Sequence, residues 1–566
     1  MGAATSARSL PVGVSSFERL VSGDYCYVDK TLLVRDVLED GAEVVLFCRP
    51  RRFGKTLNLD MLRHFFEMPA EGADAGDLFA GMLVSSCGEE VLRHQGKYPV
   101  VWLTFKDVKY PTWEGAQQEL ARLVAKECRR HRYLEESEAC DPEDRKAFLR
   151  MLSGDDHLVG EALEVLTRML AAHHGVPCVL LVDEYDTPVN EALHYGYYDE
   201  AVRFMRVFLS GGLKDNPALF HGYLTGILRV AKEGIFSGLN NLKVDTVLDS
   251  RFAQYFGFTR EEARTMCEDC GVPDKYTELC SWYDGYRFGD REMFNPWSVI
   301  NYFSNDCKPR AYWVSTSSNS VIADVLGHAT PGVVRDLTAL MEGGSVTAYV
   351  HLDAVYPRFY DDVDSAYSLL LMSGYLTVEG DQLDDAGELW SLRLPNRELA
   401  LVYRREIMSG LGAAMPSPRA KEFGKALVLG DAEALQASLE GLLLESASYF
   451  DTASEAFYHG LVLGLVATVD GRYRVESNRE AGEGRFDIAM EPADAAANFP
   501  GIIIELKAVP KANASEDQLD AQCQAAVDQI RSRQCFSDMK SHGVRDVLAY
   551  GVAFGGKRAK VQVEKL

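Results

Sequence analysis

The sequence lacks an apolar segment long enough to cross a lipid bilayer. Its longest apolar stretch runs from residue 461 to residue 469, whereas a membrane-spanning helix needs about 20 apolar residues. Residues 1–16 contain no apolar core of the length that signal peptides have. We therefore expect a cytoplasmic protein without a membrane partner.

An excess of positive charge is absent as well. The 566 residues include 59 Lys and Arg against 84 Asp and Glu, so the net charge is −25. No overall basic field would hold this chain on nucleic acid, and any such contact must come from a local basic patch. The composition excludes a histone-like binder but not an enzyme that acts on DNA.

Paired cysteine motifs are scarce. The 12 cysteines are scattered, and several lie inside apolar runs, as reduced core thiols do. Cys267 and Cys270 have the spacing of a zinc knuckle, but only Cys280 lies near them and no second pair follows. We expect ordinary helix and loop cysteines at these positions.

What the sequence does contain, over residues 1–258, is a regular alternation of strands and helices. This alternation predicts a parallel sheet that helices cover on both faces. The strands are expected at residues 44–48, 100–105, 178–182 and 222–228, and the helices at 57–67, 113–132, 155–174 and 198–213.

The rest of the chain divides into four segments. Residues 259–330 are helical and aromatic and are interpreted as a lid-like region. Residues 331–409 show helices followed by a long hairpin, which suggests a winged helix. Residues 410–430 comprise a linker and the start of a helix, and residues 431–566 form a further domain. The fold class expected is therefore α/β with several domains.

A phosphate-binding loop is indicated by Gly54-Lys55-Thr56, which stands between a buried strand and a helix. Backbone N–H groups of Arg52, Phe53 and Gly54 at this helix start would cradle phosphates. Lys55 would reach the outer phosphates, and the Thr56 hydroxyl would bind Mg²⁺. The full pattern has glycine where this chain has Arg49.

A second element strengthens the nucleotide hypothesis. The apolar run 178–182 ends in Asp183-Glu184, where Asp183 would hold the magnesium ion and Glu184 would orient the attacking water. A buried strand that ends in a capping acid would explain Asp183, but not its pairing with Lys55. Together these residues predict ATP as a cofactor, with Mg²⁺.

Two residues near the end of the strand 222–228 are weaker candidates. Thr225 could sense the terminal phosphate of the nucleotide, with Arg229 four residues further on. A strand-end threonine and a surface arginine would look the same, so this alternative stays open.

The C-terminal segment predicts a second site. Its elements follow the order helix, three strands, helix, strand. Asp487 lies on the second strand, and alternation along the third places Glu505 and Lys507 on one face. Two carboxylates could hold Mg²⁺ or Mn²⁺, which activates a water, while Lys507 positions that water or offsets charge. This is the Asp…Glu-x-Lys spacing of the PD-(D/E)XK nuclease superfamily.

Other residues could complete this second site. Glu455 on the preceding helix is a further candidate metal ligand, and Gln529 on the following helix could touch substrate or the ion-bound water. Basic residues that could contact a phosphate backbone, or simply form a solvated surface, are Arg472, Arg474, Arg479, Arg485, Lys557, Arg558 and Lys560.

Seven motifs of the chain can be taken together: 27–30 (YVDK), 49–56 (RPRRFGKT), 181–186 (LVDEYD), 224–226 (LTG), 238–242 (GLNNL), 282–289 (WYDGYRFG) and 295–297 (NPW). They resemble the bacterial and archaeal AAA-ATPase-like family, whose members typically end in a PD-(D/E)XK-type nuclease domain. The resemblance covers nearly the whole chain, and it implies a P-loop NTPase sheet in residues 1–258, a helical lid after it, and a restriction-endonuclease-like domain in residues 431–566. Arg49 in place of the first glycine looks like a trait of this family.

The resemblance implies ATP binding but supplies no biological role. The leading hypothesis is an ATP-regulated, metal-dependent nuclease that cuts phosphodiester bonds in nucleic acid, with DNA favoured over RNA and a homo-oligomer possible. The alternative is a nucleotide-switched signalling or nucleic-acid-binding protein whose nuclease-like domain does not cleave.

Overall fold

The computed structural model divides the chain into two compact units. The first comprises residues 1–317 and 345–400, and the second comprises residues 318–344 and 401–566. The structure describes residues 9–69, 77–229, 235–236, 239–313, 336–337, 339–341, 343–352, 363–380, 384, 389–403, 417–445, 458–459, 461–462, 465–466, 473–481, 484–492, 499–509, 514–533 and 536–566.

The first unit is built on a sheet of five parallel strands in the order β2-β3-β4-β1-β5. Nearly every residue of β1 and β3 is buried, because a parallel sheet under two helical layers has no solvated face. The strand β4 lies between β1 and β3, so their three carboxyl ends meet at one edge. The strands are β1 (Val44–Cys48), β2 (Val100–Thr104), β3 (Cys178–Asp183), β4 (Leu219–Gly226) and β5 (Leu242–Asp245).

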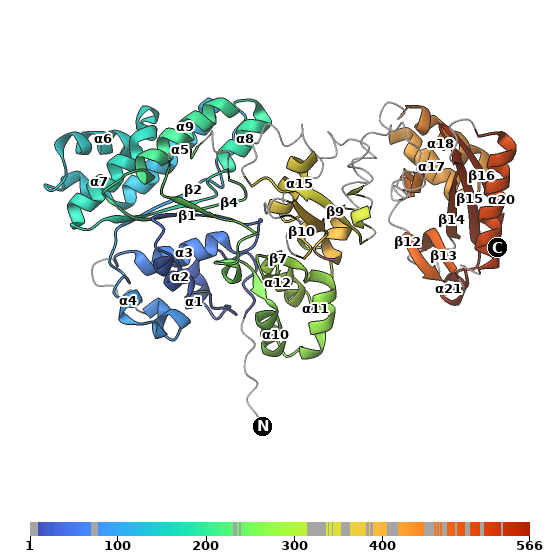
Figure 1. The fold of residues 1–566 in the computed structure, drawn as a ribbon, viewed down its shortest axis with the longest axis horizontal. Helices are drawn as coiled ribbons and strands as arrows, with labels where there is room; N and C mark the ends of the chain where they lie inside the picture. Colours follow the sequence, from blue (N-terminus) through green and yellow to red (C-terminus); the bar gives the residue numbers. More distant parts are fainter. Residues whose placement is uncertain are drawn as a thin grey trace, which may run out of the picture. The chain divides into compact units, whose positions relative to one another are not determined.

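Helices lie on both sides of this sheet, as the sequence pattern predicted. Figure 1 shows α1 to α4 on one side and α5 to α9 on the other. Their bounds are α1 (Phe17–Ser22), α2 (Leu33–Asp40), α3 (Lys55–Phe66), α4 (Glu89–Leu92), α5 (Trp113–Arg130), α6 (Pro142–Leu152), α7 (Ala162–His174), α8 (Thr187–Tyr195) and α9 (Tyr198–Leu213). Short 3-10 turns are η1 (Asp77–Phe79), η2 (Leu83–Ser86), η3 (Arg132–Glu136), η4 (Asp156–Glu161), η5 (Ala253–Tyr255) and η6 (Pro273–Lys275).

Two small antiparallel sheets follow within the first unit. One has the order β6-β8-β7 and is accompanied by α10 to α12; the other has the order β10-β11-β9 and is accompanied by α15. The second of these contains the hairpin expected from the sequence. The bounds are β6 (Phe258–Thr259), α10 (Arg260–Asp269), α11 (Tyr276–Tyr283), β7 (Tyr286–Phe288), β8 (Arg291–Phe294), α12 (Pro296–Ser304), β9 (Ser345–Tyr349), α15 (Val363–Met372), β10 (Thr377–Val378) and β11 (Leu389–Arg393).

The second unit contains a mixed sheet in the order β12-β13-β14-β15-β16. Only the pair β14–β15 is parallel, and α20 connects these two strands in the chain. The bounds are α17 (Ser417–Leu429), α18 (Ala432–Glu445), β12 (Tyr473–Ala481), β13 (Gly484–Pro492), β14 (Gly501–Ala508), α20 (Glu516–Ser532), α21 (Ser537–Ser541), β15 (Val547–Gly555) and β16 (Arg558–Lys565).

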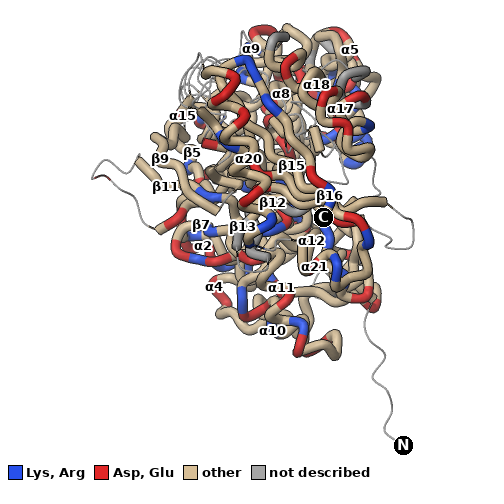
Figure 2. The backbone as a smooth tube through the Cα atoms, turned by 90° about the vertical axis from the view of Figure 1, so that its right-hand side faces the viewer, with Lys and Arg blue, Asp and Glu red and all other residues tan. Residues whose placement is uncertain are grey.

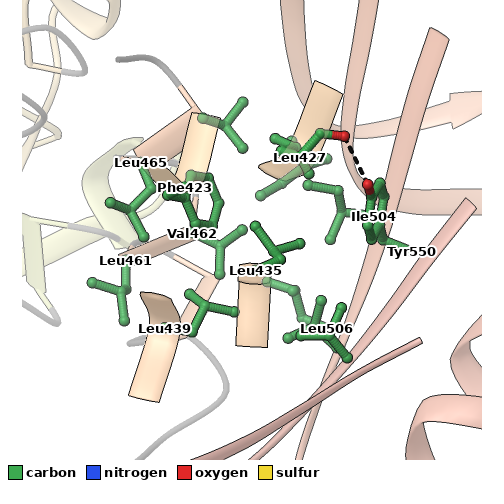
Figure 3. Packing of buried hydrophobic residues seen from close by; sticks show 14 of the residues in the cluster. Phe423, Leu427, Leu435, Leu439, Leu461, Val462, Leu465, Ile504, Leu506 and Tyr550 are labelled. Carbon is green, nitrogen blue, oxygen red and sulfur yellow. Dashed lines mark hydrogen bonds between the residues drawn. The ribbon is translucent and has the colours of Figure 1, made fainter. Parts of the chain in front are cut away.

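The two faces of β14 belong to different hydrophobic clusters. Ile504 and Leu506 pack with Phe423 and Leu435 of α17 and α18 (Figure 3), where the Tyr550 hydroxyl also donates to the Leu427 carbonyl at 2.7 Å. The opposite face packs against α20, since Ile503 shares a cluster with Ile530. Alternation therefore places residues 503, 505 and 507 of β14 on the α20 side.

Charged residues of both signs are interspersed along the chain (Figure 2). No helix among the described residues has the length and apolar character that a membrane span requires.

Candidate functional sites

The first site lies at the carboxyl ends of β1, β3 and β4. Register pairs Cys48 with Gly226 and Val182 with Leu224, so the loop after β1 and Asp183 come together on either side of Thr225. The sheet order thus brings together residues that stand more than a hundred positions apart.

Asp183 is the centre of this site and is fully buried. Its carboxylate accepts hydrogen bonds from Thr225 Oγ1 at 2.7 Å and from Thr56 Oγ1 at 3.0 Å. Thr104, at the end of β2, donates to it at 3.2 Å. Burial raises the pKa of Asp183, and the neighbouring Glu184 charge adds to that effect. The structure brings together three of the residues that sequence analysis selected, Thr56, Asp183 and Thr225.

Sequence analysis did not select Thr104, although a signal for it exists. It is the last residue of β2, and β2 is the neighbour of β3 in the sheet, paired in register with Asp183. A polar residue at the carboxyl end of a parallel strand faces the same edge as the phosphate-binding loop.

Lys55 is the first residue of α3, and its ammonium lies inside the phosphate-binding loop. Nζ donates to the carbonyls of Arg49 at 2.8 Å and Pro50 at 2.9 Å. Burial lowers its pKa, while the charges of Glu184, Asp186 and Asp183 oppose that shift. A cation at the start of a helix suits the outer phosphates of a nucleotide.

Glu184 follows β3 with a left-handed backbone, φ +52°. This conformation is uncommon for a residue other than glycine, and surrounding contacts hold it. Its N–H donates to Thr225 Oγ1 at 3.2 Å, and its carboxylate accepts from Thr187 Oγ1 at 3.2 Å. Nearby, the buried Asp186 carboxylate accepts from the N–H groups of Ile227 at 2.8 Å and Leu228 at 3.2 Å. The loops after β3 and β4 are therefore fixed to each other.

Arg49, where the usual pattern has glycine, is fully buried. Its guanidinium forms an ion pair with Asp245 of β5 and donates to the carbonyls of Cys48 and Asp245, both at 3.0 Å. The rings of Phe256 and Phe288 lie 5.0 and 5.6 Å from it. Burial raises the pKa of Asp245 to about 6, and the Arg49 charge opposes this rise. Arg49 thus fastens the start of the loop to β5.

The side chains of Arg52 and Phe53 also anchor the loop. Arg52 Nη1 donates to the Trp313 carbonyl at 2.6 Å, and its guanidinium lies 4.9 Å from the Trp297 ring. Phe53 is buried with its ring 4.9 Å from the ring of Tyr286. The backbone of Gly54 is left-handed, φ +83°, as the tight turn into α3 requires.

The assignment of Arg52, Phe53 and Gly54 to phosphate binding concerned their backbone N–H groups and stays a prediction. Arg229 lies three residues beyond the end of β4, and its role stays a prediction as well.

The second site lies between β14 and α20. Lys507 Nζ donates to Glu505 Oε1 at 2.9 Å and to Gln529 Oε1 at 3.0 Å. The Gln529 amide also donates to Glu505 Oε1. Gln529 therefore contacts both Glu505 and Lys507. It does so from α20, the helix on which the sequence predicted it.

Asp487 approaches from the antiparallel neighbour β13. Ile488 pairs with Ile504, so Asp487 stands beside Glu505 in the ladder, and its Oδ2 accepts from the N–H of Leu506 at 2.8 Å. Glu505 is buried. Burial raises its pKa, and the Asp487 charge raises it further against the influence of Lys507. A divalent cation would relieve the repulsion between these carboxylates, so the donor set fits Mg²⁺ or Mn²⁺.

Other candidates for this site are placed less fully. Glu455 and Arg472 lie outside the described residues. His459, which sequence analysis did not select, contacts the Asp487 carbonyl through Nε2 at 3.2 Å. Among the described residues no three His, Cys, Asp or Glu side chains are grouped as metal ligands, so Asp487 and Glu505 stand as a pair.

Comparison with known proteins gives two family matches. Residues 11–236 match the model described as "Predicted AAA-ATPase", and residues 453–564 match that of the PD-(D/E)XK nuclease superfamily. A relative from Azotobacter chroococcum mcd 1, described as "Uncharacterized protein in vnfD 5'region", is 28% identical over 399 residues, 70% of this chain and 69% of its own. A solved Walker-type ATPase of Pyrococcus abyssi has 14% identity and a TM-score of 0.34, covering 67% of this chain and 96% of that chain.

Proposed function

Because this chain carries a predicted AAA-ATPase domain over residues 11–236 and a PD-(D/E)XK nuclease-superfamily domain over residues 453–564, we propose that it is an ATP-regulated, metal-dependent nuclease. The observation that carries this proposal is the geometry around Glu505. Asp487, Lys507 and Gln529 converge on it from a neighbouring strand, its own strand and a helix.

For phosphodiester cleavage, each residue of this second site has a distinct task. Asp487 and Glu505 would hold the cation, which, when bound, polarises the phosphate and lowers the pKa of a bound water. Lys507 offsets negative charge that develops at the phosphate. Gln529 keeps the Lys507 ammonium and the Glu505 carboxylate in register, because its amide contacts both.

The residues of the first site have corresponding roles in binding and hydrolysing the nucleotide. Lys55 neutralises charge on the outer phosphates, and Thr56 with Asp183 would hold Mg²⁺. Thr225 orients the Asp183 carboxylate by donating to it and fixes the backbone of Glu184 by accepting from it. Glu184 is then positioned to orient an attacking water.

Regulation is the role we assign to ATP. Hydrolysis of a phosphodiester is downhill and needs only an activated water and charge stabilisation, so the Glu505 site needs no nucleotide for its chemistry. A nucleotide can still change activity by binding one conformation of the chain more tightly than another.

The test is cleavage by the full chain. Parent, Glu505→Gln and Glu564→Gln proteins are incubated with DNA and RNA, single- and double-stranded, in Mg²⁺ or Mn²⁺, with and without ATP. Glu564 is a matched control, because it lies on β16 and is paired with Arg531 at the surface. We expect the parent to cleave DNA faster than RNA, at a rate that ATP changes. Glu505→Gln should lose cleavage, and Glu564→Gln should keep it.

A second function is favoured by one observation, the direct pairing of Glu505 with Lys507 and Gln529. If that pairing keeps the cation out, the second unit binds nucleic acid without cutting, and the chain is a nucleotide-switched binding or signalling protein. Nucleic acid that is bound but never cleaved, with either metal, would decide for this alternative.

A further inference from the structure

Arg533 stands at the carboxyl end of α20, one turn beyond Gln529. Its N–H donates to the Gln529 carbonyl at 3.1 Å, and its side chain is exposed. Residues four apart lie on the same face of a helix, and the Gln529 side chain contacts Glu505 and Lys507. Arg533 therefore lies on the face of α20 that carries Gln529 to the second site.

Two other basic residues, one on β16 and one on α20, are paired with acids. Lys560 lies 3.2 Å from Asp520 and 3.6 Å from Glu516, at the amino end of α20. Arg531 is paired with Asp528 and Glu564. Sequence analysis suggested Lys557, Arg558 and Lys560 for phosphate contact, and of these Lys560 is paired with acids.

Arg533 differs from Lys560 and Arg531. Within the described part of the chain, no carboxylate lies within ion-pair distance of its guanidinium. The helix α20 is consequently polarised, with Glu516, Asp517 and Asp520 toward its start and an uncompensated cation at its end. A polyanion would be repelled from the first end and attracted to the second.

We propose that Arg533 binds a backbone phosphate of the nucleic acid that is cut at Glu505, so that the substrate crosses the carboxyl end of α20. The inference rests on the proposed function and adds a substrate-binding residue to it. A guanidinium donates two parallel hydrogen bonds to phosphate oxygens. Its charge also offsets the partial negative charge of the helix carboxyl end, which would otherwise oppose a phosphate there.

The experiment compares Arg533→Gln, Arg533→Lys and the matched control Arg531→Gln in the full chain. The probe is an end-labelled DNA duplex, bound in Ca²⁺ over a series of salt concentrations and cleaved in Mg²⁺ to obtain kcat and KM. Titration with Mn²⁺ reports the metal site separately.

We expect Arg533→Gln to bind duplex about tenfold more weakly, as the loss of a charged hydrogen bond implies. KM should rise while kcat and Mn²⁺ affinity stay near the parent values. The slope of log affinity against log salt should become shallower by about 0.9, the effect of one lost phosphate contact. Arg533→Lys should recover part of the affinity, and Arg531→Gln should match the parent.

Two results would overturn the inference while leaving the proposed nuclease intact. In one, the parent cleaves DNA but Arg533→Gln and Arg531→Gln share its affinity and salt slope. In the other, Arg533→Gln loses Mn²⁺ affinity, which would make Arg533 part of the metal site rather than of substrate binding. A parent that neither binds nor cleaves any nucleic acid would overturn the inference and the proposed function together.

Discussion

At the scale of single residues, Arg49 is the main departure from the usual phosphate-binding loop. A buried charge is stable only when it is paired and hydrogen-bonded, and Arg49 meets this condition through Asp245 and two carbonyl groups. The arginine is therefore a structural anchor whose removal leaves Asp245 buried without a partner.

Replacing Arg49 by glycine should consequently destabilise the protein, although it restores the commoner loop sequence. Breaking a buried ion pair costs about 3–5 kcal/mol. Thermal unfolding of the full chain measures the effect, and Arg49→Gly combined with Asp245→Asn should melt higher than Arg49→Gly alone. Equal melting temperatures for parent and Arg49→Gly would show that the pair contributes nothing.

Glu398 gives the first unit a pH dependence. Its carboxylate accepts from Ser298 Oγ at 2.7 Å and from the Trp313 N–H at 2.8 Å. Burial raises the pKa of Glu398 from 4.5 to about 7. The folded state therefore holds this proton more tightly than the unfolded state, so stability falls as the pH rises from about 4.5 to about 7.

Glu398→Gln should reduce this loss of stability. The neutral amide can still accept from the Trp313 N–H and can donate to the Ser298 hydroxyl. Above pH 7 the ionised Glu398 lowers the free energy of unfolding by about 3 kcal/mol. The variant should therefore have a higher melting temperature than the parent at pH 8, and the same melting temperature at pH 4.5. The exposed Glu261→Gln is the control. A parallel pH dependence in parent and Glu398→Gln would contradict the assignment.

The sequence indicated the residues whose motifs are local, but it did not indicate the distant partner of Arg49. Lys55 and Thr56 follow a glycine at a helix start, and Asp183 ends an apolar strand, so each was visible in a short window. The pairing of Arg49 with Asp245, 196 positions away, depends on which strand lies beside β1. Nothing in the local pattern specifies that neighbour.

At the scale of elements, the turn after α15 lies against the phosphate-binding loop. Gly374 has φ +84°, and a Cβ built on it would lie 2.7 Å from Pro50 Cβ. The Pro50 carbonyl accepts from Lys55 Nζ at 2.9 Å. A side chain at position 374 would therefore push on the residue that holds the Lys55 ammonium.

Gly374→Ala should weaken ATP binding, and Gly380→Ala is its matched control. Gly380 has a similar φ of +74°, but nothing lies within 4 Å of a Cβ there. Each alanine adds about 1–2 kcal/mol of left-handed backbone strain, so only the contact with Pro50 separates the two variants. Binding of a fluorescent ATP analogue measures the difference; equal affinities would show that the loop tolerates the displacement.

Long elements were predicted well, and short or irregular ones were not. The helix expected at 198–213 coincides with α9, and alternation along β14 correctly placed Glu505 and Lys507 on one face. The helix expected at 155–174 is in fact the turn η4 followed by α7 from Ala162. The strand β5, only Leu242–Asp245 with two charged residues, carries too weak an apolar pattern to stand out.

At the scale of the whole molecule, the two candidate sites lie in different units. None of the residues placed in one site contributes a side chain to the other among the contacts described above. We therefore expect the chemistry of each site to be independent of the other.

Lys55→Ala should thus abolish ATP binding yet keep basal cleavage, and Glu505→Gln should abolish cleavage yet keep ATP hydrolysis. In each case the lost group belongs to only one of the two proposed sites. ATPase and nuclease assays on the same preparations check both statements. Loss of both activities in either folded variant would mean that the sites share a catalytic step.

Regulation by ATP differs from powering by ATP in what a non-hydrolysable analogue does. A ligand shifts a conformational equilibrium only by its difference in affinity for the two states, and that difference exists on binding, before any hydrolysis. We therefore expect the analogue to change the cleavage rate as much as ATP does, and Glu184→Gln to respond to ATP without turning it over. Lys55→Ala should retain the basal rate and lose the response. If cleavage instead follows ATP turnover, and the analogue-bound protein is inactive, the first unit drives movement along the substrate or remodels it, because only an energy-consuming step would then explain the coupling.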